Sequence, residues 1–416
     1  MTDSTPLDSP AIGTSSTDLV EPCPNQEPRP AYPPAPPKQP PVALAFSGGG
    51  FRASLAALGV LRFLADAGLL GQVRWVSSVS GGSILNGAFA VAYPDIESAG
   101  FTPEALENHL VKPFVDRISS ASMQKSLAGG LWKIVGRRTR TDLLAEKLDE
   151  WFFSGRLLED IPPGCRFIFN ASNLTTGVRF GFERDVFGDY VMGRLPTAGS
   201  GLRLAQAAAA SASFPGAFAP VVLSQFTFPC SNGRTATLLD GGTYDNMGLE
   251  PLDDLNRRDR DRPEELRDAC LVVANAGGVF RTGSFGGLPF VKNLQRTNSL
   301  LYRQSVVLRT RAMVERFQAW ESAPGEKPPW ARRGVLFGLA TTMREGDAAE
   351  WRQTRPEPAR DVLIELARTP TTLEQFSQDL CERLMYRGWW LTGATLSQYH
   401  RDLLPAELPT RPDPRA

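Results

Sequence analysis

The stretch from Val42 to Phe89 constrains the fold more than any other part of the chain. Two apolar runs, Val42–Phe46 and Val73–Ser78, each lead through a turn of small residues into a segment with helical spacing of apolar residues. Short apolar runs of this kind are typical of central parallel strands that are buried on both faces. Two strand–turn–helix units in succession predict an α/β fold in which helices cover a parallel sheet.

Both turns contain residues suited to acyl-transfer chemistry. The glycines of the first turn expose backbone N–H groups at a helix start, which forms an anion site. In the second turn, Ser80 stands at a strand-to-helix corner that projects its hydroxyl above the sheet, and such corners require small neighbours, here Ser78 and Gly82. Tight packing alone is the alternative explanation. We predict that Ser80 is a nucleophile and that its oxyanion hole is formed by backbone N–H groups of Gly48, Gly49, Gly50 and Gly81.

The first turn fits two other motifs less well. Gly48-x-Gly50-x-x-Ala53 matches a variant of the dinucleotide fingerprint, but the acidic residue that this motif needs near the end of the second strand is missing. A P-loop is excluded because no Gly-Lys-Ser/Thr follows. Arg52 places a fixed charge beside the site, where it could hold a phosphate or carboxylate of the substrate, and ordinary capping is the alternative role.

A serine nucleophile needs a base, and the chain contains only two histidines, His109 and His400. His109 lies in a polar segment and is interpreted as a solvated helix residue. The order Ser80, Asp240, His400 matches that of α/β-hydrolases, so this triad is an alternative, although the residues around His400 are polar and helix-like. Asp240 fits the role of base better, because it follows an apolar run and precedes two glycines, which places its carboxylate at the end of a strand. We therefore predict a Ser80/Asp240 dyad.

Hydrophobic spacing predicts the remaining elements. Strands are predicted over residues 42–46, 73–78, 166–173, 178–187, 219–223, 235–239, 269–275 and 334–340, and helices over 52–67, 84–93, 202–211, 294–317 and 373–385. We expect residues 41–405 to form one domain with a central, mostly parallel sheet flanked by helices. Residues 101–160 are expected to be a helical insertion whose Trp, Leu, Lys and Arg residues form either a solvated surface helix or an interfacial lid that contacts anionic lipid.

The two ends of the chain have a different composition. Residues 1–40 are rich in Pro, Ser and Thr, which predicts a disordered arm, and residues 406–416 are expected to be a flexible tail. Within the arm, Pro34-Ala35-Pro36-Pro37-Lys38 resembles a polyproline ligand of an unknown protein partner, with a plain linker as the alternative.

The charge, cysteine content and hydropathy of the chain argue against several classes of protein. The formal net charge of zero argues against nucleic acid as the main partner. Five cysteines, odd in number and without a CxxC pair, favour reduced thiols over a disulfide framework or a zinc site. The N-terminus lacks the pattern of a signal peptide, and no apolar run is long enough to span a membrane. We therefore expect a cytoplasmic protein that contacts membranes only peripherally.

The three turns together resemble the patatin-like and cytosolic phospholipase A2 family of lipid acyl hydrolases. The resemblance lies in Ser47-Gly48-Gly49-Gly50-Phe51-Arg52-Ala53, in the Ser80 elbow and in Asp240-Gly241-Gly242, with looser similarity in residues 169–177 and 210–215. It covers roughly residues 42–305, and it departs from the family at Ser78, where the elbow usually begins with glycine. The resemblance implies a Ser/Asp dyad without histidine, a phosphate-binding role for Arg52, and no cofactor or metal.

These expectations together describe a serine lipid acyl hydrolase of the phospholipase A or lysophospholipase type, which forms an acyl-enzyme on Ser80. Its substrate would be a membrane phospholipid or another acyl lipid. An acyltransferase or thioesterase with the same nucleophile is one alternative. A catalytically silent lipid-binding or interaction protein is another, and a dinucleotide-binding enzyme is a third.

Overall fold

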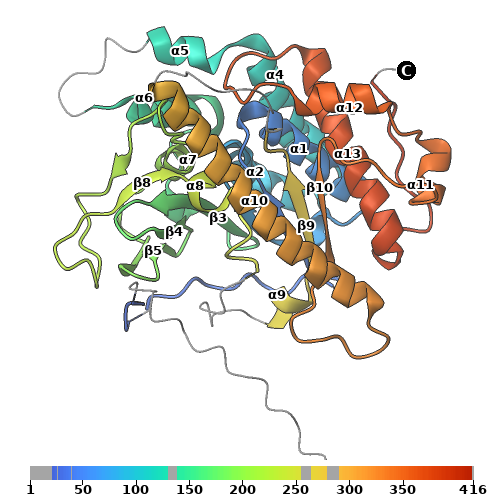
Figure 1. Cartoon of the computed structure of the whole chain (residues 1–416), viewed down its shortest axis with the longest axis horizontal. Coiled ribbons are helices and arrows are strands. Elements are labelled where there is room, and N and C mark those ends of the chain that lie inside the picture. The colour runs from blue at the N-terminus through green and yellow to red at the C-terminus, as the bar shows by residue number, and fades with distance from the viewer. Residues whose placement is uncertain are drawn as a thin grey trace, which may run out of the picture.

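A computed structural model describes residues 21–25, 27–38, 40–129, 138–253, 264–278 and 290–414 of the chain. A central sheet is covered by helices on both faces, with α10 crossing one face diagonally (Figure 1). This is the α/β architecture predicted from the sequence. The strands are β1 Val42–Phe46, β2 Val73–Ser78, β3 Arg166–Asn173, β4 Val178–Phe182, β5 Val186–Asp189, β6 Gly193–Pro196, β7 Val221–Val222, β8 Thr237–Asp240, β9 Cys270–Asn275 and β10 Gly334–Gly338.

The helices of the described ranges connect these strands and include several short ones. They are α1 Gly50–Asp66, α2 Gly81–Ser98, α3 Pro103–Leu106, α4 Lys112–Ser120, α5 Met123–Gly129, α6 Arg140–Leu148, α7 Leu204–Ser211, α8 Gly242–Asp245, α9 Glu264–Asp268, α10 Phe290–Ser322, α11 Ala349–Thr354, α12 Arg360–Ala367 and α13 Gln378–Tyr399. None of these helices combines the length and the apolar composition needed to cross a bilayer.

The sheet runs in the order β10-β9-β1-β2-β3-β4-β5-β6, and β8 pairs with both β3 and β7. The first five strands of this order are parallel to one another, and the remaining pairs are antiparallel. The predicted strand 178–187 is in fact two strands, β4 and β5, which pair with each other across a turn. The C-terminal ends of β1 and β2 lie side by side, because Phe46 is in register with Ser78.

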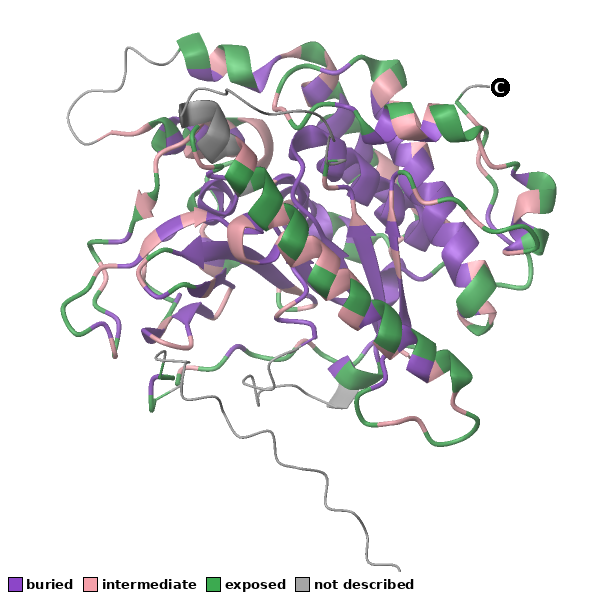
Figure 2. Cartoon of the chain, in the orientation of Figure 1, coloured by how far each residue is buried: buried purple, intermediate pink, exposed green. Residues whose placement is uncertain are grey.

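Side chains alternate between two cores along β1, as expected for a strand covered on both faces. Val42, Leu44 and Phe46 join the larger apolar cluster with α1, α2 and α13. Ala43 and Ala45 join a smaller cluster on the other face, which includes Met313 and Phe317 of α10. Figure 2 shows the buried interior beneath α10, whose outward side is largely exposed.

Helix α1 is buried along nearly its whole length because it lies between the sheet and α13. The two helices approach each other at glycines: a side chain at Gly59 would collide with the Met385 carbonyl, and one at Gly388 with the Ala56 carbonyl. The prediction of a terminal helix at 373–385 was therefore wrong in its bounds. The helix instead continues through Trp389 and Trp390, both fully buried, because they complete the core against α1 and α11.

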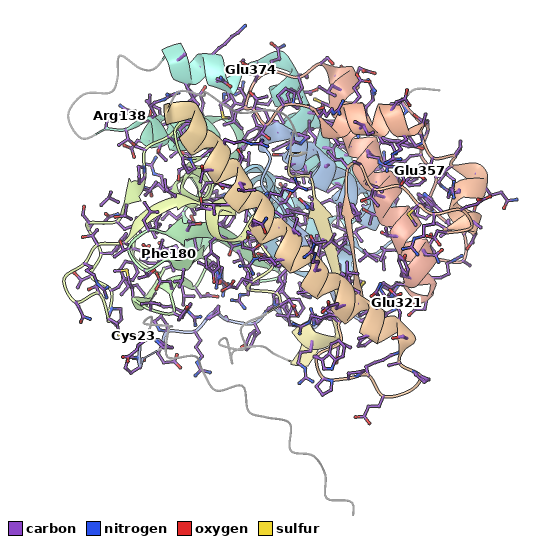
Figure 3. All side chains as sticks on the ribbon, in the orientation of Figure 1. Cys23, Arg138, Phe180, Glu321, Glu357 and Glu374 are labelled. Atoms are coloured by element: carbon purple, nitrogen blue, oxygen red, sulfur yellow. A yellow bond between two sulfur atoms is a disulfide. The ribbon has the colours of Figure 1, made fainter. Side chains whose placement is uncertain are left out.

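The predicted insertion at 101–160 is helical and packs onto the domain. Phe114, Ile118, Leu144, Leu148 and Phe153 are all buried in the main core. The basic segment that was interpreted as a surface helix or an interfacial lid falls partly on residues 130–137, which lie outside the described residues. Arg138 lies at the edge of this region, where it forms an ion pair with Glu146 (Figure 3).

The described part of the N-terminal segment differs from the expected disordered arm. The Pro34 carbonyl accepts a hydrogen bond from Arg74 Nε at 2.7 Å, and the Lys38 N–H donates to Gln72 Oε1 at 3.0 Å. Pro36, within the proposed polyproline ligand, is buried. Residues 1–20 lie outside the described residues. Residues 21–25 and 27–38 therefore pack along the domain, because backbone groups of this segment find partners near the start of β2.

A disulfide joins Cys23 to Cys230 across 207 residues, so the prediction of reduced thiols was wrong for this pair. Cys23 is buried, and its N–H donates to the Tyr190 carbonyl at 2.8 Å beside β5 (Figure 3). The sequence pattern gave no sign of this bridge because its partners lie far apart along the chain. Disulfides persist in oxidising compartments, which is at odds with the expected cytoplasmic location. Cys165, Cys270 and Cys381 are free and buried.

The C-terminal residues also differ from the expected flexible tail. Leu408 and Pro409 are buried, and the Pro409 carbonyl accepts hydrogen bonds from Arg355. Arg411 forms an ion pair with Asp66 at 2.6 Å, at the end of α1. The tail is held because its carbonyl and charged groups find buried partners on the domain.

Candidate active site

Ser80 occupies a strained turn between β2 and α2. Its φ of 52° and ψ of −117° lie outside the regions that a residue with a side chain ordinarily adopts. The following residue must be glycine, because a Cβ on Gly81 would collide with the Gly50 carbonyl oxygen. The elbow therefore lies against the glycine turn that follows β1, as the two predicted strand–turn–helix units require.

A network of buried hydroxyl and amide groups holds this elbow. The Ser80 N–H donates to Ser211 Oγ at 3.0 Å, and Ser211 Oγ lies 2.8 Å from Ser83 Oγ. Ser78 Oγ is 2.9 Å from Ser83 Oγ and also accepts from Asn86 Nδ2 at 2.9 Å. Ser78 thus fits where the family usually has glycine, because its hydroxyl is fully paired inside the turn.

The backbone at the end of β1 requires a small residue at position 82. A Cβ on Gly82 would lie 2.6 Å from the Phe46 carbonyl oxygen and 2.8 Å from that of Ser47. A side chain at residue 82 is therefore excluded where α2 begins against the end of β1. The predicted need for a small residue at position 82 is confirmed by these contacts with the neighbouring strand.

The glycine turn presents backbone N–H groups beside Ser80. Gly49 has a φ of 146° and Gly50 a φ of 60°, conformations that residues with side chains adopt rarely. The N–H groups of Gly49, Gly50 and Gly81 donate no hydrogen bond to any described residue. Among the described residues these three N–H groups therefore have no acceptor and stand at helix starts, and their role as oxyanion donors stays a prediction.

Gly48 does not match the prediction that it donates to an oxyanion. Its N–H already donates to the Asn246 carbonyl at 3.0 Å. A Cβ on Gly48 would lie 3.2 Å from Ser80 Cβ and would collide with Asn246 Oδ1. Gly48 is therefore needed for close approach, and the bond to Asn246 ties the glycine turn to the loop that follows Asp240.

The register of the sheet brings Asp240 to Ser80. β3 pairs with β2 over residues 166–169 and with β8 over residues 171–173, so β8 continues on the side of β3 where β2 ends. Asp240 is opposite Ala171, two residues beyond the Phe169–Ser78 pair. The predicted placement at a strand end is correct, but β8 is antiparallel to β3 and points back toward the end of β2.

Asp240 is a buried carboxylate, 1% exposed. Oδ1 accepts the Gly242 N–H at 2.8 Å, and among the described residues Oδ2 has no partner with normal hydrogen-bond geometry. The hydroxyls of Ser80 and Tyr302 nevertheless lie close enough to stabilise its charge, so these contacts are looser than ordinary hydrogen bonds. Burial raises the pKa of Asp240 from 3.8 to about 6, against the opposing effects of Ser80, the Gly242 N–H and Tyr302.

Arg52 is buried beneath the glycine turn and does not project into open solvent. Nε donates to the Ala276 carbonyl at 2.9 Å, Nη2 donates to Thr371 Oγ1 at 3.0 Å, and Nη1 donates to the Thr369 carbonyl. Burial lowers the pKa of Arg52 to about 10. Its visible role is to join the glycine turn to the segments after β9 and before α13, and its role toward a substrate phosphate stays a prediction.

Neither histidine lies at this site, so the alternative Ser80/Asp240/His400 triad was wrong. His400 is buried with Nε2 3.1 Å from the carbonyl oxygen of Gly334, at the start of β10. Because β10, β9 and β1 are parallel, that position is at the edge of the sheet opposite to Ser80. His109 is half-exposed and lies 3.8 Å from Asp95 near the far end of α2, as expected for a solvated helix residue.

Sequence reasoning missed several residues of this site. Ser211 holds the Ser80 N–H and donates its own hydroxyl proton to the Asn170 carbonyl at 2.6 Å. Tyr302 comes from α10, far along the chain, and nothing in its sequence context marks it. Within the described ranges, no group of three or more His, Cys, Asp and Glu residues could hold a metal ion.

The glycine turn, Ser80 and Asp240 all lie within a part of the chain that matches a known family. The model of the family described as "Patatin-like phospholipase" matches residues 44–253, a range that contains the glycine turn, Ser80 and Asp240. The chain belongs to the patatin-like phospholipase family. The family indicates in broad terms a lipid acyl hydrolase, and no curated protein matches the chain.

The solved structures that match this patatin-like chain share little sequence with it. The human GIVD cytosolic phospholipase A2 has 15% identity and a TM-score of 0.49, and the match covers 88% of this chain and 60% of that one. The same human enzyme with methyl gamma-linolenyl fluorophosphonate and terbium chloride has 16% identity and a TM-score of 0.47, with coverage of 88% and 59%. VipD from Legionella pneumophila has 14% identity and a TM-score of 0.31, with coverage of 86% and 71%. The matched part of the chain thus spans about 60% of the human enzyme.

Proposed function

We propose that this patatin-like protein is a serine lipid acyl hydrolase of the phospholipase A or lysophospholipase type, with Ser80 and Asp240 as its dyad. The observation that carries the proposal is a serine in a strained elbow whose hydroxyl is close to a buried carboxylate. The pairing of strained nucleophile, buried base and unpaired N–H groups is the arrangement that ester hydrolysis needs.

The proposed reaction has two steps. Ser80 Oγ attacks the ester carbonyl while Asp240 takes its proton, and the N–H groups of Gly49, Gly50 and Gly81 stabilise the negative oxygen. The tetrahedral intermediate collapses by expelling the alcohol portion, which regains the proton, and leaves an acyl-enzyme. Water then attacks the acyl group with Asp240 as base, which releases the fatty acid and restores Ser80.

We propose further that the substrate is presented at an anionic lipid surface. Phe214, Leu300 and Leu301 are 41%, 45% and 56% exposed, and the Phe214 ring lies 5.9 Å from that of Tyr302, next to Asp240. Residues 290–314 contain Lys and Arg but neither Asp nor Glu. Exposed apolar side chains beside positive charge are the combination that favours binding to anionic lipid.

A lipid panel tests the proposed function. We expect release of fatty acid from phospholipid or lysophospholipid that exceeds turnover of triacylglycerol and thioester, and faster release from vesicles that contain anionic lipid. Product analysis with added alcohol separates hydrolysis from acyl transfer. Failure to cleave any ester, together with no labelling of Ser80 by a fluorophosphonate probe and continued binding to vesicles, would instead support a silent lipid-binding protein.

The pH dependence should report the buried base. Asp240 can accept a proton only when it is charged, and its pKa is raised to about 6 by burial. We therefore expect kcat/KM to fall about tenfold per pH unit below about pH 6. The measurement is a pH–rate profile with a neutral ester substrate. A rate that stays constant down to about pH 4, the ordinary range of an aspartate, would contradict this prediction.

A further inference from the structure

We propose that Tyr302 of α10 is a positioning residue for Asp240, with its hydroxyl against the carboxylate so that Asp240 faces Ser80. This inference rests on the proposed function, because it assigns Tyr302 to the same dyad. Tyr302 lies 62 residues beyond Asp240 in the chain and in a different layer of the fold, so only the tertiary structure brings the two together.

The Tyr302 ring is seated on the backbone beside Asp240. A Cβ on Gly242 would lie 2.5 Å from Tyr302 Cε1 and 2.9 Å from Asp240 Oδ1. The second glycine of the Asp-Gly-Gly motif therefore leaves room for both the carboxylate and the ring. The Phe214 ring also packs against the Tyr302 ring, tilted by 47°, with the two ring centroids 5.9 Å apart.

The hydroxyl end of Tyr302 is also held. Oη lies 3.1 Å from Thr243 Oγ1, and it is close enough to the Asp240 carboxylate to stabilise the charged form. Burial raises the pKa of Tyr302, so its hydroxyl keeps a proton that it can donate toward Asp240 or Thr243. Among the described residues, the groups that act on Asp240 are the Ser80 hydroxyl, the Gly242 N–H and Tyr302, and none of these carries a charge.

The same face of α10 anchors the helix to the loop after Asp240. Ser305 Oγ donates to the Tyr244 carbonyl at 2.9 Å, and Arg309 pairs with Glu250 at 3.1 Å and with Asp245 at 3.5 Å. Positions 302, 305 and 309 lie one above the other on a helix. These bonds attach α10 to that loop one and two turns away from Tyr302, and they add to the contacts that the Tyr302 ring and hydroxyl make themselves.

The test is the pH dependence of Ser80 labelling by a fluorophosphonate probe in wild type and in Tyr302→Phe. The variant keeps the ring and loses only the hydroxyl, so it should fold. Without that donor the charged form of Asp240 is less stable, and we expect the acidic limb of the labelling rate to move up by about one pH unit. Thr243→Val removes the hydroxyl that holds Tyr302 Oη in place, so we expect it to move the acidic limb in the same direction by a smaller amount.

Ser305→Ala is the matched control, because it weakens the anchoring of α10 without touching Asp240. We expect it to lower the unfolding temperature and to leave the acidic limb where wild type has it. If Ser80 is still labelled in Tyr302→Phe and the acidic limb of the labelling rate lies at the same pH as in wild type, the role of Tyr302 is overturned and the dyad stands. A shift of equal size in Ser305→Ala also overturns it. If the probe labels wild type no faster than it labels Ser80→Ala, both the dyad and the role of Tyr302 are overturned.

Discussion

Replacing Ser80 with Ala or Asp240 with Asn is expected to lower lipid ester hydrolysis by about 10⁴-fold or more, because each change removes one half of the proposed dyad. Ala leaves no nucleophile, and the neutral Asn cannot accept the serine proton. Fatty acid release from a phospholipid measures both effects. Labelling by a fluorophosphonate should disappear in Ser80→Ala and become slow in Asp240→Asn.

The control for this prediction is Ser98→Ala at the other end of α2. Ser98 is exposed, and its hydroxyl donates only to the Asp95 carbonyl, 2.9 Å away, so its removal should leave hydrolysis unchanged. Thermal unfolding of each variant shows whether the fold persists, which matters because residue 80 has a strained backbone. Hydrolysis at the wild-type rate in Ser80→Ala or in Asp240→Asn would refute the dyad.

Replacing both Cys23 and Cys230 with Ser is expected to lower the free energy of unfolding by about 2–4 kcal/mol. The bridge joins residues 207 apart in the sequence, and without it the unfolded chain gains the freedom that the closed loop denied it. The N-terminal segment also loses its covalent attachment beside β5. Urea unfolding followed by tryptophan fluorescence measures the change.

Reductant provides the control for the disulfide prediction. The remaining cysteines, Cys165, Cys270 and Cys381, are free and buried in the described structure. A reducing agent should therefore destabilise wild type to the level of the double variant and leave the double variant itself unchanged. Equal unfolding midpoints for wild type and double variant, with and without reductant, would show that the bridge does not stabilise this protein.

Much of the central fold could be predicted because its signal is local. The runs 42–46, 73–78 and 166–173 match β1, β2 and β3 residue for residue, since buried strands and their glycine turns are determined by neighbours in sequence. The C-terminal third was harder. The helix predicted at 373–385 lies instead at Gln378–Tyr399, because its buried Trp389 and Trp390 pack against α1 and have no periodic signature of their own.

Some residues of the candidate site could likewise be predicted from local sequence, and others could not. Ser80 and the glycine turn could be found from a few adjacent residues, and the scarcity of histidine directed attention to Asp240. The N–H of Gly48 could not be assigned in advance, because its acceptor is the carbonyl of Asn246, almost 200 residues away. The contacts of Arg52 were hidden for the same reason, since its acceptors are main-chain and hydroxyl oxygens of distant segments.

The sequence by itself determined the two strand–turn–helix units, the strained place for a serine and the type of residue available as its base. Each of these depends on sterics and hydrogen bonding within a few consecutive residues. The tertiary structure alone decided that β8 enters antiparallel where β2 ends, that the Tyr302 ring lies against Gly242 beside Asp240, and that Cys23 meets Cys230. Such pairings depend on strand register and helix packing across the whole domain, and no local pattern encodes them.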